Sequence, residues 1–125
     1  MKSLLFIILS DPQFSHRTAE ALRIASGMLS LGHPVHIVFS HAALNFFRKP
    51  RYETIDYAII EQSLVQLNKY EATLLFLDTT PATALPLSNS SIKENFDNYP
   101  KLKIEHTEWT TICTLIENDD VLFLL

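Results

Sequence analysis

The stretch "LLFIILSDPQFSHRTAEALRIASGMLSLGHPVHIVF", residues 4–39, decides the fold class. It opens on an unbroken apolar run, residues 4–9, which is typical of a strand buried on both faces in a parallel sheet. The segment that follows carries apolar side chains at helical spacing, with Ser15 as the expected N-cap and Gly32 as the stop. Residues 35–39 form a second, β-branched run. The pattern therefore predicts a right-handed βαβ unit.

The rest of the chain continues this alternation. Helical spacing returns over residues 53–70 and, more weakly, over 107–116, and strands are predicted at 73–77, 102–105 and 121–125. Two segments are less regular: 41–51, predicted as a short helix or packed loop, and the proline-rich 79–100, which could hold short helical turns. The whole pattern predicts an α/β fold, a three-layer α/β/α domain with an open, mainly parallel sheet of about five strands.

Composition narrows the class of protein. At 125 residues, with 47% hydrophobic and 19% charged residues, the sequence fits one globular domain spanning 1–125. A net charge of −4 gives no electrostatic reason to bind nucleic acid, and no apolar run reaches the ~20 residues of a membrane span. The single cysteine, Cys113, excludes an internal disulfide, and the first apolar run is too short for a secretory signal. We therefore expect a cytoplasmic protein that binds neither nucleic acid nor membrane.

Polar residues follow each of the first three predicted strands, where parallel sheets bind their ligands. The ligand-binding candidates are Ser10 and Asp11 after the first strand, Ser40 and His41 after the second, and Asp78 and Thr79 after the third. Whether they lie side by side depends on the strand order. A Ser–His–Asp hydrolase could be assembled from Ser10 or Ser40 with His41 and Asp78, but the glycine-flanked serine of a nucleophile elbow is missing. Local capping by these side chains is the simpler explanation.

Other site chemistries find less support in the sequence. Residues 77–80 resemble the aspartate motif of haloacid-dehalogenase-like enzymes, but Thr80 stands where a second acidic residue is needed. Both glycines, Gly27 and Gly32, lie outside the first strand–helix turn, so neither a dinucleotide fingerprint nor a P-loop can form there. We therefore predict no cofactor and no catalytic residue.

The histidines and the cysteine give no metal or redox signal. His33 and His36 flank the start of the second predicted strand, at the opposite end from His41, and no further ligand lies nearby in the sequence. Cys113 lies among apolar residues with acidic rather than basic neighbours, as a buried and unreactive thiol does. We therefore predict no metal.

The order of elements resembles that of the DsrE/DsrF-like proteins of sulfur relay. The resemblance is carried by "LLFIILSDPQ" (4–13), "TAEALRIASGMLSLGHPV" (18–35) and "VHIVF" (35–39), and more weakly by residues 53–78 and "DDVLFLL" (119–125). It implies a subunit of homo-trimers, hexamers or hetero-oligomers with related subunits, which work with a sulfur-carrier protein. In active members a cysteine after the third strand carries a persulfide, and the corresponding place here is Leu77 or Asp78.

Three hypotheses for the function follow. The first is a non-catalytic or accessory subunit of a sulfur-relay-type assembly that acts through protein contacts. The second is a small-ligand-binding domain or enzyme that uses a strand-end pocket around Asp11, His41 and Asp78. The third is sulfur transfer through Cys113 itself. We also expect a homo-oligomer, because four aromatic residues could form an interface, although they could equally pack in the core: Phe46, Phe47, Tyr52 and Tyr57.

Overall fold

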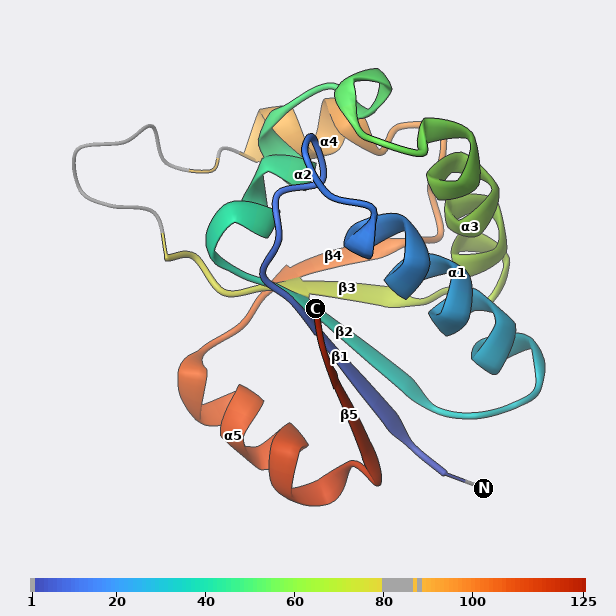
Figure 1. Ribbon diagram of the computed structural model, residues 1–125, viewed down its shortest axis with the longest axis vertical. Coiled ribbons are helices and arrows are strands. Elements are labelled where there is room, and N and C mark those ends of the chain that lie inside the picture. Colours follow the sequence, from blue (N-terminus) through green and yellow to red (C-terminus); the bar gives the residue numbers. More distant parts are fainter. Residues whose placement is uncertain (1, 80–86, 88) are drawn as a thin grey trace.

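All five strands of the sheet run parallel, in the order β4-β3-β2-β1-β5 (Figure 1). The computed structural model describes residues 2–79, 87 and 89–125. Its strands are β1 (Leu4–Ile8), β2 (Val35–Phe39), β3 (Thr73–Phe76), β4 (Lys103–His106) and β5 (Val121–Leu124). The predicted open parallel sheet is therefore confirmed, and each predicted strand is present to within one or two residues.

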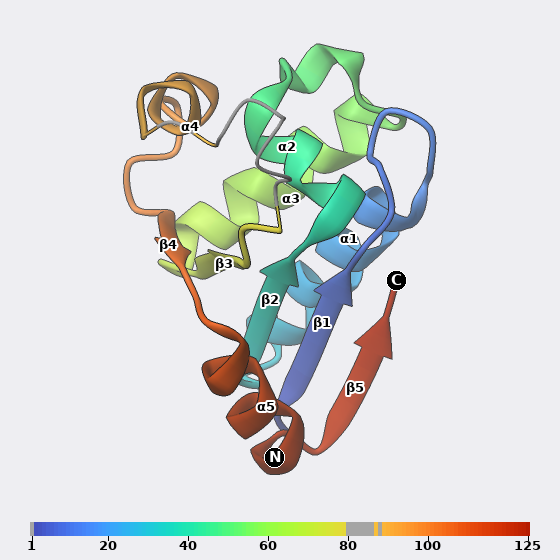
Figure 2. The same ribbon diagram turned by 90° about the vertical axis from the view of Figure 1, so that its left-hand side faces the viewer.

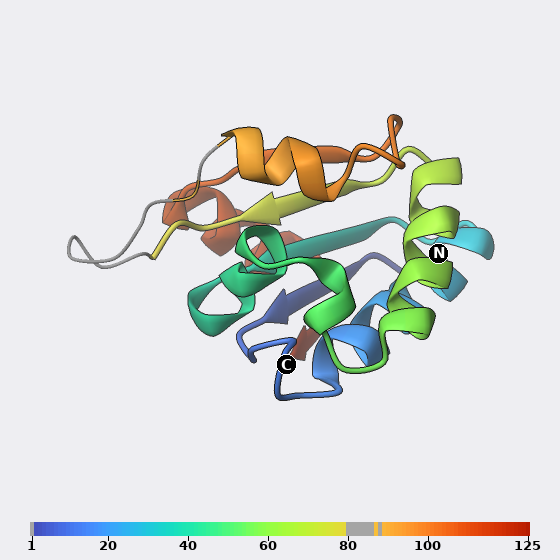
Figure 3. The same ribbon diagram turned by 90° about the horizontal axis from the view of Figure 1, so that it is seen from above.

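The helices are distributed unequally over the two faces of the sheet. They are α1 (Arg17–Ser30), α2 (Asn45–Arg48), α3 (Tyr57–Lys69), α4 (Asn89–Asn95) and α5 (Trp109–Asn118), with short 3₁₀ turns at His41–Leu44 and Arg51–Glu53. Helices α1 to α4 lie on one side, which we call the first face, and α5 lies on the other, the second face (Figure 1). Seen from above, α2, α3 and α4 lie in front of the strands (Figure 3). The α/β/α layering is thus confirmed, with one thick and one thin helical layer.

Helix α1 ends as the sequence predicts and begins differently. Gly32 has φ 89°, its N–H donates to the Leu29 carbonyl at 3.0 Å, and the His33 N–H donates to the Met28 carbonyl at 3.1 Å. This is a Schellman motif, whose left-handed position favours glycine. At the other end the N-cap is His16, not Ser15. The Ser15 hydroxyl instead accepts the Arg17 N–H at 3.2 Å.

The segment between β2 and α3 supplies the centre of the first-face core. The Phe46 and Phe47 side chains are fully buried, and both rings lie 5.0 Å from the Phe39 ring. Of the two alternatives that the sequence left open for these phenylalanines, packing in the core is therefore the correct one. Tyr52 and Tyr57 are exposed, at 72% and 44%. The two phenylalanines are buried because α2 turns them toward the sheet, as an apolar pair beside a buried strand requires.

The second face has a much smaller core. Its buried side chains are Leu5, Ile7 and Val38 from the sheet and Ile112 from α5. Leu75 and Leu77 pack beside them only partly buried. Since alternate residues of a strand point to opposite faces, the unbroken apolar runs in the strands supply this face as well as the first.

The irregular segment predicted over residues 79–100 contains α4 and the turns that follow it. Residues 80–86 and 88, with two of its prolines, lie outside the described residues. Within the part of the chain that is described, no helix is both long and apolar enough to cross a membrane.

Candidate functional site

The strand order brings the predicted candidates together. Because β3, β2 and β1 are adjacent and parallel, the residues that follow them meet at the carboxyl ends of these strands. The arrowheads of β1 and β2 point toward this end of the sheet, below α2 and the β1–α1 loop (Figure 2). The candidates Ser10 and Asp11, Ser40 and His41, and Asp78 and Thr79 therefore share one end of the sheet.

After β1, both candidate side chains hold neighbouring segments in place. The Ser10 hydroxyl donates to the Leu125 carbonyl at 2.6 Å. One carboxylate oxygen of Asp11 accepts the Gln13 N–H at 3.0 Å, and the other accepts the Asn45 side-chain amide at 2.8 Å. The Asp11 carboxylate thus closes an Asx-turn and joins the β1–α1 loop to α2.

After β2, the chain makes a strained turn at His41. Its φ of 55° lies in the left-handed region, which costs a non-glycine residue about 1 kcal/mol. The His41 N–H donates to the Thr79 hydroxyl at 2.9 Å, and His41 Nδ1 lies 2.9 Å from the Ser40 hydroxyl. These two contacts hold the turn and join the ends of β2 and β3.

This geometry does not support the hydrolase hypothesis. Ser40 is only 3% exposed, so a substrate in solvent cannot reach its hydroxyl. Ser10 directs its hydroxyl to a backbone carbonyl and not to an imidazole. A nucleophilic serine needs both access to substrate and a base within hydrogen-bonding distance. The hydrogen bonds of both serines therefore have a structural role.

The structure adds a second location that the sequence did not indicate. β3 leads to α4 on the first face, whereas its neighbour β4 leads to α5 on the second. A crevice forms in α/β sheets where adjacent strands continue to opposite faces. Phe76 and His106 are paired in register and their rings lie 5.4 Å apart, so Asp78 and Glu108 both lie two residues beyond this pair. We call the ends of β3 and β4 the switch point.

The end of β4 and the start of α5 contribute His106, Glu108 and Trp109 to the switch point. His106 Nδ1 lies 3.4 Å from a Glu108 carboxylate oxygen, and both side chains are exposed. Trp109, the first residue of α5, is 60% exposed. The only signal for this location in the sequence was the polar residues that follow a predicted strand. Without the strand order, these residues could not be connected to Asp78.

The remaining histidines and the cysteine lie elsewhere. His36 Nδ1 lies 2.9 Å from an Asp119 carboxylate oxygen, and His33 Nδ1 lies 3.1 Å from the Lys2 carbonyl. Cys113 is half-buried on α5. Among the residues the structure describes, no three His, Cys, Asp or Glu side chains converge as metal ligands. The His36–Asp119 pair joins β2 to the corner between α5 and β5.

A cluster of ionisable residues lies between segments that cover the first face. The Arg51 Nε donates to a Glu61 carboxylate oxygen at 2.6 Å, and the Tyr99 hydroxyl donates to the other oxygen. The Arg51 guanidinium also lies 5.1 Å from the centre of the Phe96 ring. Burial, followed by the hydrogen bond to Glu61, raises the pKa of Tyr99 well above that of a free tyrosine. The cluster joins α3 to the segment after α4, which is a structural role.

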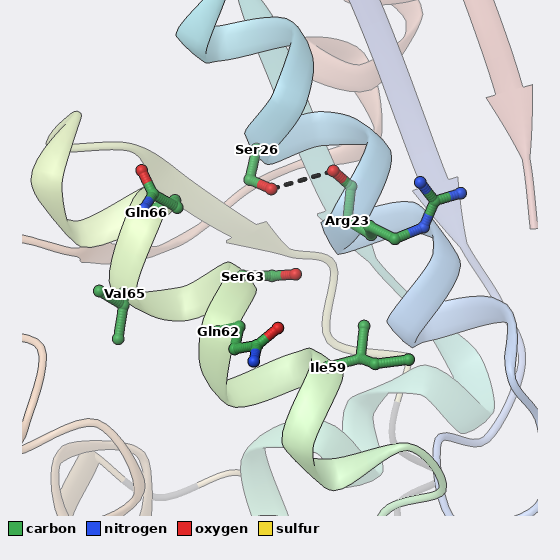
Figure 4. Close-up of a pocket in the computed structure, with 7 residues that line it drawn as sticks. All are labelled: Arg23, Ser26, Ile59, Gln62, Ser63, Val65 and Gln66. Atoms are coloured by element: carbon green, nitrogen blue, oxygen red, sulfur yellow. Dashed lines mark hydrogen bonds between the residues drawn. The ribbon is translucent and has the colours of Figure 1, made fainter.

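Two grooves on the surface lie away from the strand ends. One, of about 480 Å³, runs between α1 and α3 and is lined by Arg23, Ser26, Ile59, Gln62, Ser63, Val65 and Gln66 (Figure 4). Its Ser26 hydroxyl donates to the Arg23 carbonyl at 2.9 Å, and the Arg23 guanidinium is paired with Glu20. The second, of about 430 Å³, lies beside α4 and β4. Neither groove is lined by the strand-end candidates.

Comparison with known proteins agrees with this architecture. The model of the DsrE/DsrF-like family matches residues 2–123, and the chain belongs to that family. The crystal structure of the YchN protein from E. coli is similar, with a TM-score of 0.66 and 13% sequence identity over 100% of both chains. At that identity the likeness concerns the fold alone. No curated protein matches the sequence.

Proposed function

We propose that this chain is a non-catalytic or accessory subunit of a sulfur-relay-type assembly and that it acts through protein contacts. The observation that carries the proposal is the composition of the switch point. The resemblance to DsrE/DsrF-like proteins places a persulfide cysteine after the third strand, and here β3 is followed by Leu77 and Asp78. The one cysteine of the sequence, Cys113, lies on α5.

The chemistry of sulfur relay explains why this difference matters. A thiolate attacks the outer sulfur of a donor persulfide, a new S–S bond forms, the old S–S bond breaks, and the donor leaves as a thiolate. A carboxylate at Asp78 cannot hold sulfur in this way. The carrier cysteine would then be supplied by a related subunit or a sulfur-carrier protein, in a homo- or hetero-oligomer as the family resemblance implies.

Exposed apolar side chains support a role in protein contacts. Trp109 is 60% exposed at the switch point, and aromatic side chains are enriched at protein interfaces. Leu122 and Leu124 of β5 are 47% and 64% exposed. A partner that covers these side chains would remove apolar surface from water and so gain affinity.

The test compares sulfur uptake by engineered and native thiols. Wild type, Cys113→Ala, Cys113→Ala with Asp78→Cys, and a control, Cys113→Ala with the exposed Asp97→Cys, are treated with a persulfide donor. Intact-protein mass and transfer to an acceptor protein are then measured. We expect the Asp78→Cys thiol alone to acquire one sulfur atom and pass it on. A Cys113-dependent, transferable sulfur on the wild type would contradict the proposal.

The strand-end ligand hypothesis is tested separately by Asp78→Ala. An accessory subunit is expected to assemble as the wild type does, because the substitution leaves α5 and β5 unchanged. Sedimentation velocity measures assembly, and thermal-shift screening against small metabolites measures ligand binding. A ligand that stabilises the wild type but not Asp78→Ala would favour the ligand-binding hypothesis.

A further inference from the structure

The outer edge of β5 has hydrogen-bonding groups that no described strand uses. β5 pairs only with β1, through bonds that include Val121 N–H to the Ser3 carbonyl at 3.1 Å and Leu125 N–H to the Ile7 carbonyl at 2.8 Å. In a strand, successive residues direct their N–H and C=O groups to opposite sides. Leu122 and Leu124 therefore direct theirs outward, where Figure 2 shows no further strand beyond β5.

The side chains of β5 are apolar on both faces. Leu122 and Leu124 lie in register beside Leu5 and Ile7 and so project to the second face, where they are 47% and 64% exposed. Phe123 projects to the first face, with its ring stacked 4.7 Å from that of Phe6. No residue from 121 to 125 is charged. Charged residues are a common means of protecting an exposed edge from pairing, and this edge lacks them.

We propose that β5 pairs antiparallel with β5 of a second copy of this chain, around a two-fold axis at Phe123. Only one register satisfies all the outward groups: Leu122 must lie opposite the second copy's Leu124, and Leu124 opposite its Leu122. Both are then hydrogen-bonded pairs of an antiparallel ladder, with Phe123 opposite its own equivalent between them. The two sheets become one continuous sheet across the axis.

The alternation of inward and outward groups argues against the same pairing at the other edge strand, β4. The bonds from Lys103 N–H to Ala72 and from Thr107 N–H to Phe76 direct residues 103, 105 and 107 toward β3. The outward groups are therefore those of Ile104 and His106, and matching them across a two-fold axis places Glu105 opposite its own equivalent. Like charges directly opposite each other destabilise a strand pair. β4 thus repels the arrangement that β5 permits.

The paired edge also covers the apolar side chains beside it. On the second face, Leu122 of one copy packs against Leu124 of the other, twice, and the exposed Ile116 at the end of α5 lies on the same face. A stable interface buries roughly 1,200–2,000 Å², more than two short strands provide, so α5 must contribute to the contact. A closed two-fold contact of this kind is the commonest symmetry among protein oligomers.

The inference rests on the proposed function only for the expectation of assembly, and its tests do not involve sulfur. In the first test, Leu122→Lys is combined with either Leu124→Glu or Leu124→Lys. In the proposed register the first pair of substitutions places opposite charges across the axis, and the second places like charges there. We expect the Lys/Glu variant to remain dimeric, and the Lys/Lys variant to raise the dimer dissociation constant by roughly a hundredfold. The control is Val65→Lys, at an exposed residue of α3.

The second test locates the register by disulfide formation in the Cys113→Ala background. Leu122→Cys and Leu124→Cys chains are oxidised alone and as an equimolar mixture. Opposed residues of a ladder lie within disulfide distance, so only the mixture is expected to cross-link efficiently. A wild type that sediments as a monomer at high micromolar concentration, equal association of the two charge variants, or cross-linking of either chain alone would each overturn the proposed interface. Loss of this interface would leave the sulfur-uptake result for Asp78→Cys unchanged.

Discussion

The two faces of the sheet differ in how completely helices cover them. On the first face, α1 to α4 enclose a large core that includes the phenylalanines of β2 and α2. On the second, α5 alone covers four enclosed side chains and leaves Leu122, Leu124 and Ile116 exposed. The strands are nevertheless apolar on both faces. The first face therefore supplies most of the buried core, and the second keeps the exposed apolar side chains that the proposed dimer would cover.

The largest expected effect comes from matched truncations on the two faces. Ile60 on α3 is fully buried and Ile112 on α5 is 2% exposed, so Ile→Ala removes the same atoms from each. We expect Ile60→Ala to lower the free energy of unfolding by about 4 kcal/mol and Ile112→Ala by about 2 kcal/mol, because the thinner layer can collapse around the cavity. Urea unfolding measures both. Equal losses would contradict the difference between the faces.

A smaller effect is expected at the contact that joins the end of α5 to the sheet. The Asp119 side chain is 5% exposed and lies 2.9 Å from His36 Nδ1, so removing His36 leaves a buried carboxylate without this partner, whereas removing Asp119 leaves a half-exposed imidazole. We expect a double-mutant cycle of Asp119→Ala and His36→Ala to give a coupling energy of about 1 kcal/mol. Hydrogen exchange of the α5 amides should also become faster in Asp119→Ala. Additive losses with unchanged α5 exchange would show that the pair does not anchor the helix.

An effect of similar size is expected within the first face, at Tyr99. Its pKa is raised in the folded state, so an unfolded chain loses the phenol proton at a lower pH than the folded one does. The stability that Tyr99 contributes is therefore fully present below about pH 10 and decreases as the pH rises above it. Tyr99→Phe should cost about 1 kcal/mol at neutral pH and flatten this alkaline decrease. Thermal unfolding between neutral and alkaline pH measures both, with the exposed Tyr52→Phe as the control.

The sequence predicted the fold well because local signals agreed with one another. The apolar run of β1 and the glycine after α1 each predict an element and its end without reference to the rest of the chain. The burial of Phe46 and Phe47 could not be decided in this way, since an apolar pair after a strand suits a core and an interface equally. Only the position of α2 over the sheet resolves it.

The candidate site was predicted only in part. The residues after β1, β2 and β3 were identified from strand ends, and their proximity depended on a strand order that no local pattern encodes. The switch point was missed although β4 was predicted, because it requires β4 to lie beside β3 and the helices that follow them to lie on opposite faces, and no local pattern encodes either. The Ser40–His41 turn depends on a left-handed histidine, which the sequence does not reveal.

The position of β1 in the sheet has a consequence for synthesis of the chain. β1 is synthesised before the other described strands, yet one of its two neighbours is β5, and the Ser3–Asp120 hydrogen bond spans 117 residues. Contacts of such long sequence separation form slowly and late. On the ribosome, one edge of β1 therefore stays unpaired until residues 121–125 have emerged, although β1, β2 and β3 can already be paired. During that interval the nascent chain exposes an apolar strand edge, and a chaperone that binds extended apolar segments would find its target there.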